Sequence, residues 1–224
     1  AKAGWLVEPT EAVHVGFGNV LGADGKMMRS RAGDSVKLAD LLDEAIERAE
    51  AAIAEKNPEL AAYQRAKVAE MVGIGALKYF DLSTDRIKDY QFDWDRMLAF
   101  EGSTGPYLQY AHARICSVFR RADIERASVR QVPIALIEPQ ERALALRLLA
   151  YPTAITASLG TYAPHKLCTY VYELASDFSS FYQECPILKS KEPVRSSRLA
   201  LADLTARVLA HSLGLLGIAA PEEM

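Results

Sequence analysis

The residue types best suited to chemistry gather on one predicted helix, which begins at Gly105-Pro106. Proline suits the first turn of a helix because the N–H that it lacks would be unpaired there. At about 100° per residue, one arc of about 80° on this helix carries two phenols, two guanidinium groups and a hydroxyl, from Tyr107, Tyr110, Arg114, Ser117 and Arg121. Phenol rings stack on unpaired RNA bases, and guanidinium groups pair with phosphates and stack on flat rings. This side of the helix is therefore a candidate surface for single-stranded RNA.

The opposite side of the same helix is apolar and carries Leu108, His112, Ile115, Phe119 and Ala122. We expect this side to face the core and His112 to be a buried, hydrogen-bonded residue. A second interpretation of the aromatic side also fits, in which the tyrosines pack beneath a neighbouring helix and the arginines are ordinary surface charges. Spacing alone favours this second interpretation, because aromatic stripes on helices usually face a core.

A second group of residues that could do chemistry lies in the segment 26–31, on a turn between a strand-like stretch and a helix. It contains Lys26, Arg29, Ser30 and Arg31, whose charges and hydroxyl could hold a polyphosphate. In nucleotidyl transfer, such groups neutralise pyrophosphate as it leaves. Taken alone, however, a segment of this kind is more often a basic surface turn.

Other kinds of site are not indicated. The histidines have no second ligand at metal-binding spacing, and the sequence has no Gly-x-Ser-x-Gly elbow, dinucleotide fingerprint or phosphate-loop pattern. Three widely spaced cysteines indicate neither a zinc site nor a disulfide framework, and they suit a reducing compartment. No apolar run approaches the roughly 18 residues of a membrane span, and no signal peptide pattern is present at the start. The first residue is Ala1 instead of Met, so we expect the sequence to be part of a longer protein.

The sequence has 224 residues, of which 50% are hydrophobic and 25% are charged. This length and composition are typical of a globular protein with one core or two smaller ones. The net charge of −3 argues against indiscriminate nucleic-acid binding. The charge is uneven, because 13 basic and 18 acidic residues precede Gly105, whereas 13 basic and 11 acidic residues follow from Gly105 onward. This asymmetry weakly favours an anionic partner for the second half.

Apolar periodicity and chain breakers predict a mostly α fold with a small β remnant at the start. Residues 12–21 have a strand-like pattern interrupted by glycines, and residues 81–95 form a less regular connector. The second predicted helix should turn Tyr63 inward, and its Gly73 and Gly75 indicate close packing. Helices are predicted for residues 35–56, 59–80, the stretch 103–130, 140–150, 152–159, 165–184 and 195–216.

Several segments in order resemble bacterial arginyl-tRNA synthetases, which are class I aminoacyl-tRNA synthetases. The segment 25–45 resembles the region of the second signature motif of that family, and the segment 104–114 resembles the first helix of its anticodon domain. The segments 164–170 and 221–224 are similar as well. Order and spacing agree from about residue 13 to the last residue, and several motifs in the right order are far more specific than any one of them.

The resemblance implies the end of a Rossmann catalytic domain followed by an all-helical bundle that binds the tRNA anticodon. It divides the chain into three parts. Residues 1–34 are the end of the catalytic domain, and residues 35–102 are a helical connector that contacts the tRNA stem. Residues 103–224 are the anticodon-binding domain. The resemblance also implies a cytoplasmic, monomeric parent enzyme that charges an arginine tRNA with arginine and uses ATP with its associated Mg²⁺.

For the basic segment, the resemblance implies that Lys26, Arg29 and Ser30 match the Lys-Met-Ser-Lys-Ser loop, which lies on the ATP phosphates. The match departs from that pattern, because Met28 stands where the loop has a small serine and Arg29 where it has a lysine. The His-Ile-Gly-His motif of class I synthetases is missing from the sequence. On its own, the chain should therefore not activate arginine.

For the aromatic side of the helix, the resemblance implies contact with the bases of the anticodon loop through Tyr107, Tyr110 and Arg114, with Arg121 on the same side and Met224 nearby. Two other hypotheses stay open: a stand-alone, non-catalytic RNA-binding paralogue and a helical protein-interaction module. Burial of both tyrosines beneath another helix would favour the protein-interaction module.

Overall fold

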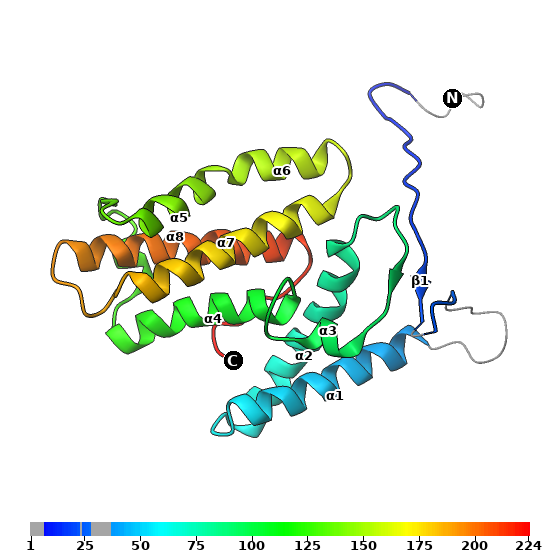
Figure 1. Ribbon diagram of the computed structural model, residues 1–224, viewed down its shortest axis with the longest axis horizontal. Helices are drawn as coiled ribbons and strands as arrows, with labels where there is room; N and C mark the ends of the chain where they lie inside the picture. Colours follow the sequence, from blue (N-terminus) through cyan, green and yellow to red (C-terminus); the bar gives the residue numbers. More distant parts are fainter. Residues whose placement is uncertain (1–6, 23, 28–36) are drawn as a thin grey trace.

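A computed structural model of the chain describes residues 7–22, 24–27 and 37–224 (Figure 1). Among these residues, no helix combines the length and the apolar character that crossing a membrane requires. The helices and strands follow in the order β1 (Val20–Leu21), α1 (Leu38–Lys56), α2 (Ala62–Ser83), β2 (Tyr90–Gln91), α3 (Trp94–Leu98), α4 (Gly105–Ala122), the 3-10 helix η1 (Arg126–Val129), α5 (Pro139–Leu149), α6 (Tyr151–Leu159), α7 (Pro164–Glu184) and α8 (Val194–Leu215).

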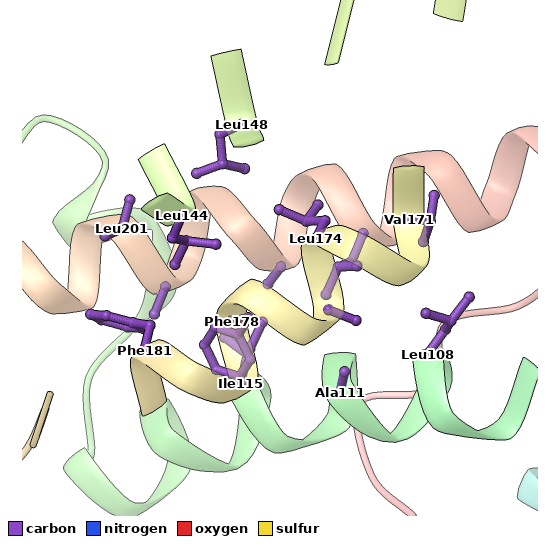
Figure 2. Close-up of a cluster of buried hydrophobic side chains, with 14 of the residues drawn as sticks. Leu108, Ala111, Ile115, Leu144, Leu148, Val171, Leu174, Phe178, Phe181 and Leu201 are labelled. Carbon is purple, nitrogen blue, oxygen red and sulfur yellow. The ribbon is translucent and has the colours of Figure 1, made fainter. Parts of the chain in front are cut away.

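The larger core lies between α4, α7 and α8, with α5 and α6 packed over α7 (Figure 1). Its centre is made by apolar side chains that recur every three or four residues on α7, as the sequence predicted. Leu174, Phe178 and Phe181 of α7 are fully buried, and they lie between Ile115 of α4 and Leu144 of α5 (Figure 2). This packing fixes which side of α4 faces the protein.

A second, smaller core joins α1 to α2, and glycines let the helices of this part approach one another. A Cβ atom on Gly73 would lie 2.6 Å from the carbonyl oxygen of Ala45 on α1. A Cβ atom on Gly75 would lie 2.7 Å from the side-chain nitrogen of Gln109 on α4. Close packing at both glycines, which the sequence predicted, is confirmed, since a side chain at Gly73 would meet the backbone of α1 and one at Gly75 would meet the buried amide of Gln109.

The β structure is a two-stranded parallel sheet, in which Val20 pairs with Tyr90 and Leu21 with Gln91. The strand-like pattern of residues 12–21 therefore forms a strand only over its last two residues. A strand needs a hydrogen-bonded neighbour, and among the described residues β2 offers one only at this point. Phe17, just before β1, is 87% exposed. The expected small β remnant is confirmed, and it is shorter than the pattern indicated.

The predicted helices are confirmed, with bounds that differ by up to three residues outside the stretch 103–130. That stretch is not one helix: α4 ends at Ala122, because Asp123 adopts a left-handed backbone with φ of 53°, and η1 follows. The cap predicted at Ser35 lies outside the described residues. Tyr63 is 81% exposed, so the inward orientation predicted for it was wrong. It lies in the first turn of α2.

We expect Leu174→Ala to lower the free energy of unfolding by about 2–5 kcal/mol, because it removes a fully buried side chain from the larger core. The matched control is Leu149→Ala, since Leu149 is also helical but is 76% exposed and should change stability by no more than about 0.5 kcal/mol. Urea denaturation followed by circular dichroism measures both. Equal losses in the two variants would contradict the position of this core.

Candidate nucleic-acid interface

The start of α4 is fixed by its cap, as the sequence of this segment allows. Thr104 is the N-cap residue, and its Oγ1 accepts a hydrogen bond from the backbone N–H of Tyr107 at 3.2 Å. The same hydroxyl donates to the carbonyl oxygen of Ala99 at 2.6 Å. Leu108 and Ile115 are completely buried and Phe119 nearly so, which confirms the apolar side predicted for this helix.

The two predicted tyrosines of α4 differ in their surroundings. Tyr107 is half-buried, with its ring centroid 5.9 Å from that of Tyr172 on α7 and its hydroxyl in a 3.2 Å hydrogen bond with the hydroxyl of Ser179. Tyr110 is 39% exposed. Tyr107 is thus partly packed beneath a neighbouring helix, as the alternative interpretation stated, whereas Tyr110 presents its ring to the surface.

The guanidinium group of Arg114 lies close to two aromatic rings. Its central carbon is 4.7 Å from the ring centroid of Tyr110 and 5.6 Å from that of Tyr182 on α7. Both distances are within the range of cation–π contacts, which are worth roughly 0.5–1 kcal/mol at exposed sites. The contacts hold the guanidinium in place beside the exposed tyrosine ring.

Two hollows adjoin this group, with volumes of about 690 Å³ and about 560 Å³. The larger one continues over apolar side chains, including Ile53 and Phe100. The smaller one continues over Ser117, Arg120 and Arg121 and is therefore polar and basic. Both hollows are lined by Asn57, Tyr110, Arg114, Gln183 and Met224.

The structure brings Met224 to this surface from the far end of the chain. The side-chain amide of Asn57, which follows α1, donates a 3.2 Å hydrogen bond to the carbonyl oxygen of Met224. All of the residues predicted for RNA binding thus line one of the two hollows: Tyr107, Tyr110, Arg114, Arg121 and Met224.

Three residues of this surface were missed by the sequence reasoning. Tyr182 lies at the edge of the buried stripe of α7 and is half-exposed. Gln183 follows it and is exposed, and Asn57 lies in the break after α1. The position of Tyr182 at the edge of the α7 stripe was a usable signal; the other two residues gave none, because their place depends on contacts between distant segments.

The predicted phosphate-binding residues are only partly described. Lys26 is exposed on a turn after β1, where its backbone N–H donates to Oδ1 of Asp24 at 3.0 Å and its ammonium group lies 3.9 Å from that carboxylate. Gly25 has a φ of 71°, which suits glycine at this turn. Lys26 lines neither hollow on α4. Arg29 and Ser30 lie outside the described residues.

Comparison with known proteins shows which family the chain belongs to. Residues 108–224 match the DALR anticodon binding domain family, and residues 1–94 match the family described as tRNA synthetases class I (R), catalytic domain. The fold and these matches define a helical anticodon-binding domain that is joined to part of a class I tRNA synthetase catalytic domain. More narrowly, the chain belongs to the arginyl-tRNA synthetase family and corresponds to the C-terminal part of those proteins.

Individual relatives support the same family. The chain is 53% identical over 223 residues to the arginine–tRNA ligase of Frankia casuarinae, and the aligned region covers 100% of this chain and 38% of that protein. The structure is similar to the arginyl-tRNA synthetase of Plasmodium falciparum, with a TM-score of 0.81 and 32% identity over 94% of this chain and 35% of that one. It is also similar to the Thermus thermophilus arginyl-tRNA synthetase, with a TM-score of 0.79 and 35% identity over 92% of this chain and 34% of that one. The chain thus spans less than two fifths of each of these three relatives.

We expect the buried His112 to make stability depend on pH. Burial lowers the pKa of His112 below its ordinary value of 6.5, and the nearby charge of Arg126 lowers it further. The hydrogen bond to the carbonyl of Pro221 and the charge of Glu222 raise the pKa, but burial has the largest effect. Between the folded and unfolded pKa values the unfolded chain binds more protons, so the free energy of unfolding should fall as the pH drops from about 7.5 to about 5. Urea denaturation across this range measures the effect.

The control for this expectation is His112→Asn, which has no titrating ring and retains a side-chain N–H donor. Its stability should decline less steeply with falling pH than that of the wild-type chain. Parallel curves for the two proteins would show that His112 does not carry a lowered pKa.

Proposed function

We propose that this chain binds the anticodon stem-loop of an arginine tRNA through the surface formed by the two hollows on α4. The observation on which the proposal rests is the guanidinium of Arg114, which lies within cation–π distance of the rings of Tyr110 and Tyr182 and lines both hollows. A flat cation beside an exposed phenol is a stacking surface for splayed-out bases. The match of residues 108–224 to an anticodon-binding family supports this use of the surface.

Each part of the surface has a role that follows from its chemistry. An unstacked base can lie on the exposed ring of Tyr110, with Tyr107 and Met224 lining the same hollow. The amide of Gln183 offers a donor and an acceptor to the edge of a base. Arg121, at the polar hollow, is suited to a backbone phosphate.

We further propose that the parent protein is an arginine–tRNA ligase, a cytoplasmic monomer that activates arginine with ATP and transfers it to the tRNA. In that protein, Lys26 and Arg29 neutralise the charge of the ATP phosphates as pyrophosphate leaves, and the Ser30 hydroxyl donates a hydrogen bond to them. Residues 1–34 are the end of its catalytic domain, residues 35–102 a connector on the tRNA stem, and residues 103–224 the anticodon-binding domain. The match to a class I catalytic domain family and the named ligases among the relatives support this assignment.

By itself the chain is proposed to bind tRNA without activating arginine, because its sequence contains no His-Ile-Gly-His motif. The protein-interaction hypothesis would be favoured by burial of both Tyr107 and Tyr110. Tyr110 is exposed, and this favours the RNA-binding hypothesis instead.

The proposal is tested by titrating the chain with an unmodified arginine anticodon stem-loop at low salt. The control RNA has the same stem and a different anticodon. We expect the matched RNA to bind more tightly, since bases rather than phosphates distinguish the two molecules. Equal affinity for both RNAs would contradict anticodon reading.

In the same titration, Tyr110→Ala and Arg114→Ala should each weaken binding by about 1–3 kcal/mol, because each removes one of the stacked groups. The matched controls are Tyr162→Ala, between α6 and α7, and Arg142→Ala on α5, which replace exposed residues that line neither hollow. Their affinities should stay within about twofold of the wild type. If the controls lose as much affinity as the two variants, RNA does not bind at this surface.

A further inference from the structure

The last residues of the chain are held on α4 by side chains. Residues 218–224, here called the tail segment, contain no helix or strand. Their backbone carbonyl oxygens accept four side-chain hydrogen bonds: Gln109 Nε2 to Ala219 at 2.9 Å, His112 Nδ1 to Pro221 at 2.9 Å, Arg120 Nη1 to Glu222 at 2.8 Å, and Asn57 Nδ2 to Met224 at 3.2 Å. Ordered side chains of other segments thus replace the backbone pairing that the tail segment lacks.

Two of these donors, Gln109 and His112, are buried on α4, with exposed fractions of 0% and 3%. The second N–H of the Gln109 amide donates to the carbonyl oxygen of Met71 on α2 at 2.9 Å, so this side chain joins α2, α4 and the tail segment. Gly75 leaves the space that the amide occupies. A carbonyl oxygen only accepts, so Nδ1 of His112 carries the hydrogen in its bond to Pro221.

The path of the tail segment leads from these buried contacts to the hollows. Its Ile218 is 3% exposed and anchors the segment in the larger core. Farther on, the carboxylate of Glu223 lies 3.7 Å from the guanidinium of Arg120, and Met224 lines both hollows. Figure 1 shows the tail segment, in red, passing from the end of α8 across α4 to the side where α1 and α2 lie.

We propose that Gln109 and His112 are positioning residues of the RNA-binding surface, which hold the tail segment so that Met224 forms a wall of the hollows. This inference rests on the proposed function, because the position of Met224 matters for binding only if RNA occupies the hollows. Neither side chain lines a hollow itself, so both act through the tail segment. The proposal also explains why Gln109 and His112 are polar, although both lie on a buried side of α4. Apolar residues there would avoid the cost of desolvation.

The placement of Met224 is tested first, without RNA, in the 224-residue chain carrying ¹³C-labelled methionine methyl groups. A Met224→Leu variant assigns the Met224 signal, and Met97, which is 1% exposed on α3, serves as the internal reference. We expect His112→Leu and Gln109→Leu to shift the Met224 signal and leave the Met97 signal in place. His112→Asn, which keeps an N–H donor, should leave both signals near their wild-type positions.

The link to RNA is tested by a double-mutant cycle with the arginine anticodon stem-loop. We expect His112→Leu and Met224→Ala each to weaken binding about fivefold, and the combined variant to bind about as well as Met224→Ala alone. His112→Asn should bind within about twofold of the wild type. This lack of additivity distinguishes a positioning role of His112 from a general loss of stability. A general loss would make His112→Leu weaken binding both in the wild-type chain and in the Met224→Ala variant.

Each result decides the proposal. An unmoved Met224 signal in the leucine variants overturns the positioning role, and so do independent, multiplying losses of affinity in the cycle. If His112→Leu does not fold, Gln109→Leu replaces it in the methyl spectrum and in the cycle, because the Gln109 amide holds the carbonyl of Ala219 in the same tail segment. A wild-type chain that binds no RNA removes the proposed function, while the methyl spectrum still shows separately whether the tail segment is held.

Discussion

The enclosure of α4 decides where this chain can bind another molecule. Leu108 and Ile115 are fully buried toward the core formed with α7 and α8, and Gln109 and His112 are buried toward α2 and the tail segment. A helix packed at the density of a protein interior cannot turn about its axis without opening voids. The side of α4 that carries Tyr110 is therefore held at the surface, because the other sides of the helix are packed.

The candidate surface is composite, and its parts come from distant places in the sequence. α4 contributes a phenol and a guanidinium, α7 contributes Tyr182 and Gln183, the end of α1 contributes Asn57, and the tail segment contributes Met224. Because the Arg114 guanidinium lies within cation–π distance of both Tyr110 and Tyr182, it is oriented before any ligand arrives. Preorganisation of this kind reduces the entropy lost on binding.

Lys26, at the start of the proposed phosphate-binding segment, lies in another part of the fold than the candidate surface. Lys26 follows β1, whose partner β2 connects to the helices through α3, and it lines neither hollow on α4. The two matched families divide the chain in the same way, with the catalytic family over residues 1–94 and the anticodon-binding family over residues 108–224. The proposed phosphate-binding and base-binding residues thus lie on separate elements of the chain.

The amino-acid sequence by itself determined the helices, the two sides of α4 and the apolar stripe of α7, because a period of 3.6 residues is a local property. The resemblance added the family, to which several motifs in order pointed. Only the tertiary structure decided that Tyr107 is half-buried while Tyr110 is exposed, that Tyr63 faces outward, and that a ten-residue strand pattern yields a two-residue strand. It also brought Asn57 to Met224 across 167 positions. Such contacts depend on how separate helices pack, and no local pattern records which distant segment will cover a given side chain.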